Sequence, residues 1–381
     1  MKFIKWIFYM LLGLIALFCS YVILSGNHYL FFTVRHTVLE GRLGPSIDEH
    51  HIYPSNPVAI GAPHPWKEKK IDAKFTQEEL KFHQDYETAA FLVVHKDSII
   101  FEYYDQEHEE SSLMNPWSMA KSVNSLLIGI AIDEGLIESE DVLLSNYFDQ
   151  YNGSGITIKH LLTMSSGINF DEHYLNPLSH SARSLYGKDL VELNNNYEPV
   201  RAPGDSFDYQ GGNTILLGMI LKKATGMSLA DYASEKLWQP IEAEHTANWS
   251  MDRKDGMERA FCCLNSTLRD FARLGKLIMQ GGKWKEQTVV SEVYLQKAMV
   301  PADIVLENGE SNLKYGYHWW LLNIEKYKGY YARGIQGQYL VVLPEEELIV
   351  VRFGDQRPST RYKGHVTDML YYIDMARRMV E

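Results

Sequence analysis

The sequence has few of the residues that build disulfide frameworks, metal centres or nucleotide sites. Its 381 residues include three cysteines, Cys19 near the N-terminus and the adjacent pair Cys262 and Cys263. Adjacent cysteines are not expected to bridge to each other, so we expect no disulfide framework. The histidines lack metal-ligand spacing, and the chain contains neither a His-Glu-x-x-His motif nor a glycine-rich phosphate loop. We therefore expect no metal and no cofactor.

Positive charge is scarce as well. The chain has 37 Lys and Arg residues against 49 Asp and Glu residues, which gives a formal net charge of −12. Because no basic patch offsets this balance, we expect no nucleic-acid partner. The composition is otherwise ordinary for a globular protein, and the chain is long enough to bury a sizeable core.

A long run without charged residues occurs at the N-terminus. Residues 6–26 are mostly large apolar side chains and follow Lys2 and Lys5. A bilayer is spanned by about 20 such residues, and the lysines favour an N-terminus that stays in the cytoplasm. We predict that residues 1–26 are a single-pass anchor in the inner membrane, with the rest of the chain on the exported, periplasmic side. A cleaved signal peptide is the alternative.

The remaining chain divides into a lead-in and one globular domain. Residues 27–74 contain scattered glycine and proline and are predicted to be an extended lead-in, and residues 75–381 form the domain. Residues from about 138 to 265 are predicted to form a helical lobe. We expect an α+β fold in which both ends of the domain build one antiparallel sheet flanked by helices. The β-rich runs are 89–95, 98–104, 315–322, 329–332, 338–343 and 348–353.

A Ser-x-x-Lys sequence, Ser118 to Lys121, opens a predicted buried helix over 119–135. Apolar residues at steps of three and four indicate the helix, which brings both side chains to one face. A serine becomes a good nucleophile when a base takes its proton, and a lysine can be that base where burial lowers the pKa of its amine. A second Ser-x-x-Lys, Ser311 to Lys314, has no apolar helix behind it, and we interpret it as a chance match.

Two later segments supply candidate partners for this pair. Tyr209 lies on a tight turn before a predicted helix over 213–224, where its phenol could relay a proton. A tyrosine packed in the core is the alternative interpretation. The segment 332–338 leads into a strand, and its glycines allow a loop to approach the nucleophile closely.

Taken in order, Ser118-x-x-Lys121, Tyr209-Gln-Gly211 and Ala332-Arg-Gly334 resemble the Ser-x-x-Lys, Tyr-x-Asn and Lys-Thr-Gly signatures of penicillin-recognising serine enzymes. Over roughly residues 75–381 the chain is similar to the class C β-lactamase-like serine hydrolases. These include esterases, D-aminopeptidases and aminohexanoate-dimer hydrolases. The resemblance implies a β-lactamase/transpeptidase-like fold, with the active site between the sheet and an inserted helical lobe.

The resemblance also implies roles for individual residues. Ser118 would be the acylated nucleophile, Lys121 its base and Tyr209 the proton relay. The backbone N–H groups of Ser118 and Ile335 would form the oxyanion hole, and the substrate would be a small ester or amide. Further substrate contacts are predicted at six positions around the three motifs: Trp117, Gly211, Asn213, Arg333, Gly334 and Gln338.

Two motifs depart from the family pattern. The second motif is Tyr-Gln-Gly, so the usual amide is missing unless Asn213 reaches back. The third is Ala-Arg-Gly, so the lysine that helps to bind a β-lactam carboxylate is replaced by Arg333, whose geometry differs. These departures disfavour β-lactamase activity but leave acyl transfer to water intact. The alternatives are a cell-wall peptidase or amidase, a β-lactamase, or a catalytically silent binding or sensor domain.

Overall fold

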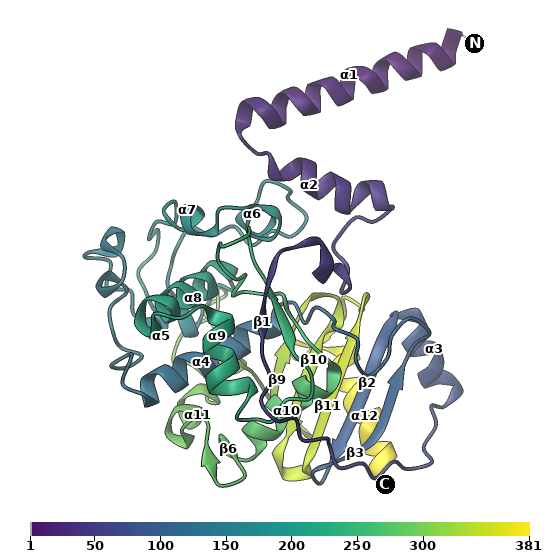
Figure 1. Ribbon diagram of the computed structural model, residues 1–381, viewed down its shortest axis with the longest axis vertical. Coiled ribbons are helices and arrows are strands. Elements are labelled where there is room, and N and C mark those ends of the chain that lie inside the picture. Colours follow the sequence, from purple (N-terminus) through teal and green to yellow (C-terminus); the bar gives the residue numbers. More distant parts are fainter. Residues whose placement is uncertain (1) are drawn as a thin grey trace.

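The computed structural model describes residues 2–381 and centres on a six-stranded antiparallel sheet (Figure 1). The hairpin β2–β3 forms one edge, and the meander β8–β11 forms the rest, so the sheet is built from both ends of the globular part, as predicted. Lys96 and Asp97 form the hairpin turn with positive φ values of 48° and 61°, which suits a tight two-residue turn. The order across the sheet is β3 (Ser98–Tyr104), β2 (Thr88–His95), β11 (Leu348–Gly354), β10 (Tyr339–Leu343), β9 (Tyr327–Arg333) and β8 (Trp320–Ile324).

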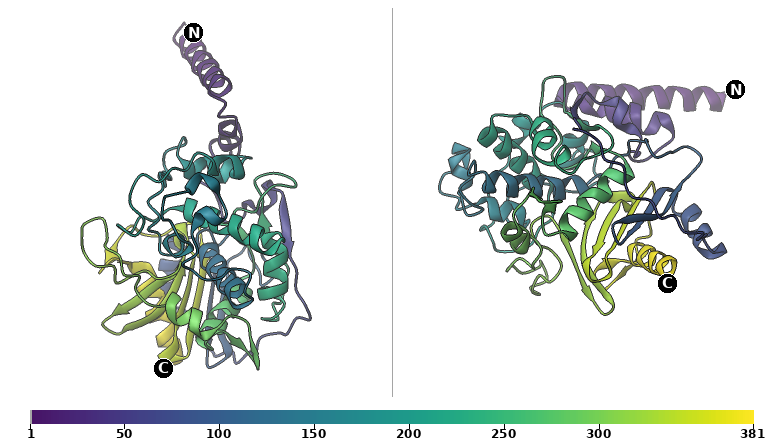
Figure 2. Two further views of the ribbon diagram at one scale, coloured as in Figure 1. Left: turned by 90° about the vertical axis from the view of Figure 1, so that its left-hand side faces the viewer. Right: turned by 60° about the horizontal axis from the view of Figure 1, so that its bottom comes forward.

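Both faces of the sheet are covered, because its strands are apolar on both sides. On β10, Leu340 and Val342 join the larger core beneath α10 (Leu268–Met279), whereas Val341 and Leu343 join a second core beneath α12 (Thr367–Val380). This is the two-residue alternation of a strand. Helix α12, yellow in the right-hand view of Figure 2, lies on the sheet face away from the helical lobe.

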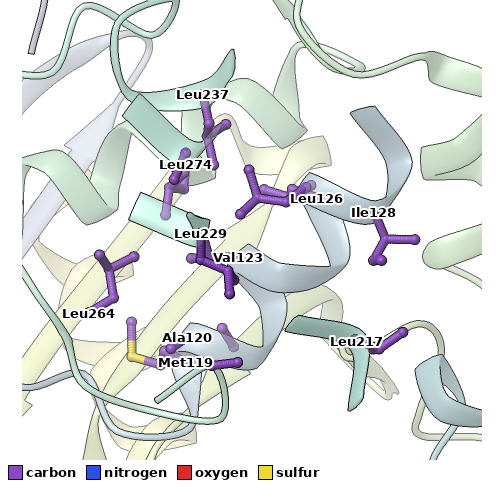
Figure 3. Packing of buried hydrophobic residues seen from close by; sticks show 14 of the residues in the cluster. Met119, Ala120, Val123, Leu126, Ile128, Leu217, Leu229, Leu237, Leu264 and Leu274 are labelled. Atoms are coloured by element: carbon purple, nitrogen blue, oxygen red, sulfur yellow. The ribbon is translucent and has the colours of Figure 1, made fainter. Parts of the chain in front are cut away.

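The lobe is organised around helix α4 (Met119–Asp133), which is buried for most of its length and packs against α8 (Gly211–Thr225). Figure 3 shows Met119, Val123 and Leu126 of α4 facing side chains of the lobe and of α10. The predicted helix ends two residues earlier than expected, at Asp133, because Gly135 takes a φ of 72°. The other lobe helices are α5 (Ile158–Leu162), α6 (His180–Tyr186), α7 (Leu190–Asn194) and α9 (Leu229–Ala233), the last continued by a π-helical turn, Ser234–Trp238.

The N-terminal segment corrects the prediction of an extended lead-in. Helix α1 (Lys2–Ser25) projects from the body, and a second helix, α2 (Tyr29–His36), follows and lies against the lobe near α6 (Figures 1 and 2). Residues of β1 (Ser55–Val58) pair with β4 (Ala247–Ser250) in a separate sheet. Helix α2 is held against the lobe by the Tyr29 hydroxyl, which donates to the carbonyl oxygen of Pro177 at 2.9 Å.

Smaller elements complete the chain. Helix α3 (Gln77–Asp85) starts with a capping box of Thr76 and Glu79. The predicted strand 315–322 is shorter than expected, because the N–H groups of Tyr317 and His318 donate to Ala298 and Leu162 in the lobe. The remaining elements are β5 (Leu264–Asn265), β6 (Lys283–Trp284), β7 (Gln287–Thr288), α11 (Glu292–Ala298), β12 (Arg361–Tyr362) and β13 (His365–Val366).

Candidate active site

Ser118 is the residue immediately before α4, and the turn that presents it is held in an uncommon conformation. The preceding Trp117 has a φ of 48° and is nearly fully buried, a combination that is rare for a bulky residue and typical of functional turns. Two hydrogen bonds hold it. Its backbone N–H donates to Asn115 Oδ1 (2.9 Å), and its indole N–H donates to Gln336 Oε1 (2.7 Å). The turn therefore presents Ser118 in a fixed position.

Lys121 lies one turn along α4, with its side chain buried beside the serine. Its Nζ donates to Ser118 Oγ and to the carbonyl oxygen of Phe261, both at 3.0 Å. The same Nζ lies 5.2 Å from the centre of the Tyr209 ring. The first two motifs predicted from the sequence thus converge in space, and the amine is within proton-transfer distance of the serine hydroxyl.

A buried histidine lies beneath this pair. The Nε2 atom of His318 is 3.0 Å from the Thr214 hydroxyl, and its backbone carbonyl accepts a hydrogen bond from Ser122. Burial and the positive charge of Lys121 lower the pKa of His318 to about 3. The imidazole is therefore neutral at physiological pH and packs as part of the floor of the site.

Tyr209 lies on the turn before α8, as predicted. Its ring stacks on Trp320, with centroids 6.0 Å apart, and meets Tyr315 edge-on at 6.1 Å. Trp320 is held in turn by Arg333, whose guanidinium carbon lies 4.0 Å from the centre of the Trp320 ring. Through Trp320, Tyr209 of the second predicted motif is thus connected to Arg333 of the third.

The third motif closes against the nucleophile turn, as its glycine suggested. A Cβ atom at Gly334 would collide with the backbone carbonyl oxygen of Pro116, two residues before Ser118. Ile335 follows and lines the same pocket as Ser118 and Lys121. The close approach therefore requires glycine at position 334 and brings the backbone of residue 335 to the site.

Three residues predicted to contact substrate have internal partners instead. Asn213 is fully buried, and its Oδ1 accepts the hydroxyl of Ser166, so it does not reach back to replace the missing amide. Gln338 donates to the carbonyl oxygens of Ile335 (3.0 Å) and Gly354 (2.7 Å), which supports the loop. The N–H of Gly211 donates to a carboxylate, Glu172 Oε2, at 2.7 Å.

Arg333 is placed differently from these three. Its stacking on Trp320 leaves Nη1 buried with no hydrogen-bond partner among residues 2–381. A buried guanidinium N–H without a hydrogen-bond partner lowers the stability of the folded protein. This N–H is therefore a donor that no acceptor within residues 2–381 satisfies.

Glu172 and Tyr174 belong to the site and were missed by the sequence analysis. Glu172 Oε1 accepts the Tyr174 hydroxyl (2.7 Å), while Oε2 faces the N-terminus of α8. Burial raises the pKa of the Glu172 carboxyl, whereas the charge of Lys121 and these hydrogen bonds oppose that rise. Both residues lie on a loop without a helical or strand pattern, so the sequence offered no signal that distinguishes them from solvated polar residues.

The pocket above Ser118 has a volume of about 190 Å³ and is largely apolar. Its floor comes from α4 and from the residues around Phe261 and Ile335. Its roof comes from two segments that the sequence analysis did not assign to the site. These are the N-terminal segment 33–45, which contributes Thr33, Thr37, Leu43, Gly44 and Pro45, and the lobe segment 172–186, which contributes Glu172, Tyr174, Leu175, Pro177, Ser181, Ala182, Leu185 and Tyr186.

The adjacent cysteines also require a correction. Cys262 and Cys263 form a disulfide with each other, contrary to the expectation from their spacing. Cys263 takes a φ of 67°, so the backbone turns sharply between the two. This turn follows Phe261, whose carbonyl oxygen accepts the hydrogen bond from Lys121, and Cys262 lines the pocket.

Comparison with known proteins assigns the chain to a family. The family model described as Beta-lactamase matches residues 72–367, which is most of the chain. The chain belongs to the beta-lactamase family. It is 26% identical over 295 residues to the 6-aminohexanoate-dimer hydrolase of Paenarthrobacter ureafaciens, covering 72% of this chain and 74% of that protein. It is 25% identical over 147 residues to Penicillin-binding protein 4* of Bacillus subtilis (strain 168), covering 36% and 30% of the two chains.

Solved structures share the fold. The structure described as "Putative 6-aminohexanoate-dimer hydrolase from Bacillus anthracis" superposes with a TM-score of 0.75 at 21% identity, covering 88% of this chain and 93% of that one. A family VIII carboxylesterase superposes with a TM-score of 0.62 at 16% identity, covering 79% and 95%. The predicted fold and the predicted family are confirmed, and the protein is a serine hydrolase of the beta-lactamase fold.

Proposed function

We propose that this protein hydrolyses small esters or amides through a covalent acyl-enzyme on Ser118. The observation that carries the proposal is the 3.0 Å contact between Lys121 Nζ and Ser118 Oγ at the base of an apolar pocket. Lys121 takes the hydroxyl proton as Oγ attacks the carbonyl carbon. The tetrahedral intermediate carries its negative charge on the former carbonyl oxygen, which the N–H groups of Ser118 and Ile335 stabilise.

Tyr209 completes the first half of the reaction in this proposal. Its phenol passes the proton held by Lys121 to the departing alcohol or amine, and the bond between the carbonyl carbon and the leaving group breaks. Water then attacks the acyl-serine, loses a proton through the same two residues, and releases the acid with Ser118 regenerated. The lysine amine lies 5.2 Å from the Tyr209 ring centre, so the two side chains are neighbours in the site.

The substrate class follows from the pocket and from the relatives. The internal position of Asn213 and the replacement of the third-motif lysine by Arg333 favour simple esters and amides over β-lactams. Among the relatives, one is named for hydrolysing an aminohexanoate dimer and one is a carboxylesterase. Arg333, with its unsatisfied buried N–H, is the candidate contact for a substrate oxygen.

We further propose that Lys2–Ser25 is a single-pass anchor and that the hydrolase domain lies on the exported side of the inner membrane. The helix is long and apolar enough to cross a bilayer, and Lys2 and Lys5 precede its uncharged part. Extraction of membranes with alkaline carbonate tests this proposal. Retention of the protein in the pellet is expected, and its release as a shorter chain would instead indicate a cleaved signal peptide.

A hydrolysis panel tests the chemistry. The full-length protein in detergent is given a p-nitrophenyl ester, the matching p-nitroanilide and a chromogenic cephalosporin, in parallel with the Ser118→Ala variant. We expect ester cleavage, slower anilide cleavage and no cephalosporin cleavage, each dependent on Ser118. Cephalosporin cleavage would support the β-lactamase or cell-wall peptidase alternative, and a folded protein inactive on all three would support the silent binding domain.

A further inference from the structure

The entrance to the catalytic pocket lies beside the proposed membrane anchor. Three residues separate the end of α1 from the start of α2, and Thr33 of α2 and Thr37, immediately after it, line the pocket. Helix α2 has eight residues, so it is about 12 Å long at 1.5 Å per residue. The Tyr29 hydroxyl donates to the Pro177 carbonyl oxygen (2.9 Å), which fixes α2 to the lobe side of the roof. The pocket therefore opens within a short distance of the last residues of α1.

Large apolar side chains surround this entrance and face solvent. Leu43 and Leu175, which lie on the two roof segments, are 98% and 96% exposed. Leucines that line a pocket rarely remain so accessible, because each leaves apolar surface in contact with water. We call the whole set the entrance rim, and it comprises Val38, Leu39, Leu43, Leu175 and Leu178.

The entrance rim is continuous with the apolar surface of α1. Phe31 of α2 is exposed and packs edge-on against Phe18 of α1, with centroids 5.9 Å apart. A neighbouring hollow between α2 and the α6 region is lined by exposed Arg35 and Lys188 and by the ion pair of Arg183 with Asp189, so its net charge is positive although the chain as a whole carries −12. Apolar residues flanked by basic residues next to a membrane span are typical of a surface that rests on an anionic bilayer.

The pocket behind the rim is apolar and can receive the part of a hydrocarbon chain next to the carbonyl group. Its lining between the rim and Ser118 includes Leu185, Tyr186, Phe261 and Ile335. An acyl chain that entered past Leu43 and Leu175 would meet apolar side chains up to the nucleophile. Its carbonyl group would then reach Ser118 at the base of the pocket.

We propose that the entrance rim sits in the bilayer surface and that the enzyme takes its substrate from the membrane, as an ester or amide with a long acyl chain. This inference rests on the proposed acyl-enzyme chemistry and on the proposed anchor. It adds the source of the substrate and its chain length. The rim is covered by lipid, and the acyl chain moves from the bilayer into the pocket without crossing water.

The test uses the full-length protein reconstituted into vesicles of phosphatidylcholine with a minor share of phosphatidylglycerol. Two substrates are compared, water-soluble p-nitrophenyl acetate and p-nitrophenyl palmitate carried in the vesicles. The double variant Leu39→Ser with Leu178→Ser removes rim leucines that do not line the pocket. The control, Val293→Ser with Leu313→Ser, removes residues that are 66% and 68% exposed, the first on α11 at the far end of the molecule from α1 (Figure 1).

We expect the rim variant to lose at least about tenfold in kcat/KM on the palmitate, because two leucines no longer bury apolar surface in lipid. Its rate on the acetate should stay within about twofold of wild type, which also shows that it is folded. The control should match wild type on both substrates. Equal losses on both substrates, or no loss on either, would overturn the inference and leave the proposed chemistry intact.

Two further outcomes are informative. If wild-type protein cleaves neither ester, the proposed function fails and this inference fails with it. If the rim variant changes the protein from a dimer to a monomer in detergent, a second copy covers the rim, and the membrane inference is wrong.

Discussion

The floor and the roof of the pocket are built in different ways. On the floor, Ser118 precedes α4 directly and Lys121 lies in its first turn, and the helix is buried in the largest core of the protein. The roof combines segments 33–45 and 172–186, which are far apart in the sequence and carry almost fully exposed leucines. Core packing therefore holds the floor in a single conformation, whereas few buried contacts hold the roof.

This difference separates the residues that carry out the reaction from the residues that select the substrate. A base must lie within hydrogen-bonding distance of its nucleophile, which a buried helix can guarantee. A substrate pocket needs shape and polarity, which loops can vary without disturbing the core. Changes to the floor should therefore affect every substrate, and changes to the roof should affect some substrates more than others.

The largest effect is expected from Ser118→Ala. Loss of the nucleophile should lower kcat for any ester by at least about 10⁴-fold. The melting temperature should change little, because the serine hydroxyl does not belong to the hydrophobic core. Steady-state kinetics with a p-nitrophenyl ester measure the loss. Full activity in this variant would mean that the reaction takes place elsewhere on the protein.

Lys121→Ala and Tyr209→Phe should come next. Each removes one proton-transfer group and should lower kcat by roughly 10² to 10⁴-fold on esters and amides alike. The second Ser-x-x-Lys sequence provides matched controls, since Ser311→Ala and Lys314→Ala should leave the rate unchanged. A near-normal rate in either floor variant would remove that residue from the mechanism.

Gly334→Ala tests the contact between the third motif and the nucleophile turn. The added methyl group collides with the Pro116 carbonyl oxygen, so the loop that carries Ile335 must move, and kcat should fall by roughly 10 to 100-fold. Gly61→Ala is the control, because its Cβ would make only an ordinary contact with Gln239. Unchanged kcat in Gly334→Ala would show that the oxyanion site does not depend on this approach.

Glu172→Gln should produce a smaller effect that depends on the substrate. The change removes a charge that accepts hydrogen bonds from Gly211 and Tyr174, and kcat/KM should fall by about tenfold. The loss should differ between neutral and amine-bearing esters, because only the latter meet the lost negative charge. Glu198 is exposed, so Glu198→Gln is the control. If Glu172→Gln lowered kcat/KM equally for all substrates, Glu172 would act with the floor residues and not in substrate selection.

The pH dependence of stability should report on the buried histidine beneath the floor. Burial lowers the pKa of His318, beneath the floor, to about 3. Unfolded chains therefore bind an extra proton as pH falls below the ordinary value of 6.5, and the free energy of unfolding drops by about 1.4 kcal/mol per pH unit from this residue. Denaturant titrations from pH 7 to 4 should show this slope in the free energy of unfolding. In His318→Asn the slope should be smaller by the contribution of about one proton. An unchanged slope would contradict the buried neutral state.

His108 behaves in the opposite sense near the lead-in. Hydrogen bonds to Asp48 and Asp105 outweigh burial and raise its pKa to about 9. Its contribution is complete below pH 6.5 and is lost as pH rises through 9. Limited proteolysis of the lead-in should therefore accelerate at alkaline pH, and His108→Asn should abolish this pH dependence. Cleavage that is independent of pH would mean that His108 does not hold the lead-in.

Sequence reasoning reached the floor because its signals are local. The periodicity of α4, the β-rich run of β10 and the spacing of Ser118 and Lys121 all arise within a few residues. It missed the roof because no local pattern connects α2 with Tyr174, and contact between them depends on the folded lobe. The disulfide between Cys262 and Cys263 and the shortened strand at 315–319 were missed for a related reason, since tertiary contacts bend the backbone there.

Intact mass spectrometry after exposure to an activated aryl ester tests the central claim most directly. The wild-type protein should gain the mass of one acyl group, peptide mapping should assign it to Ser118, and Ser118→Ala should gain nothing. An acyl group on another residue, or a folded wild-type protein that turns over the ester without any adduct on Ser118 under rapid quenching, would contradict the account.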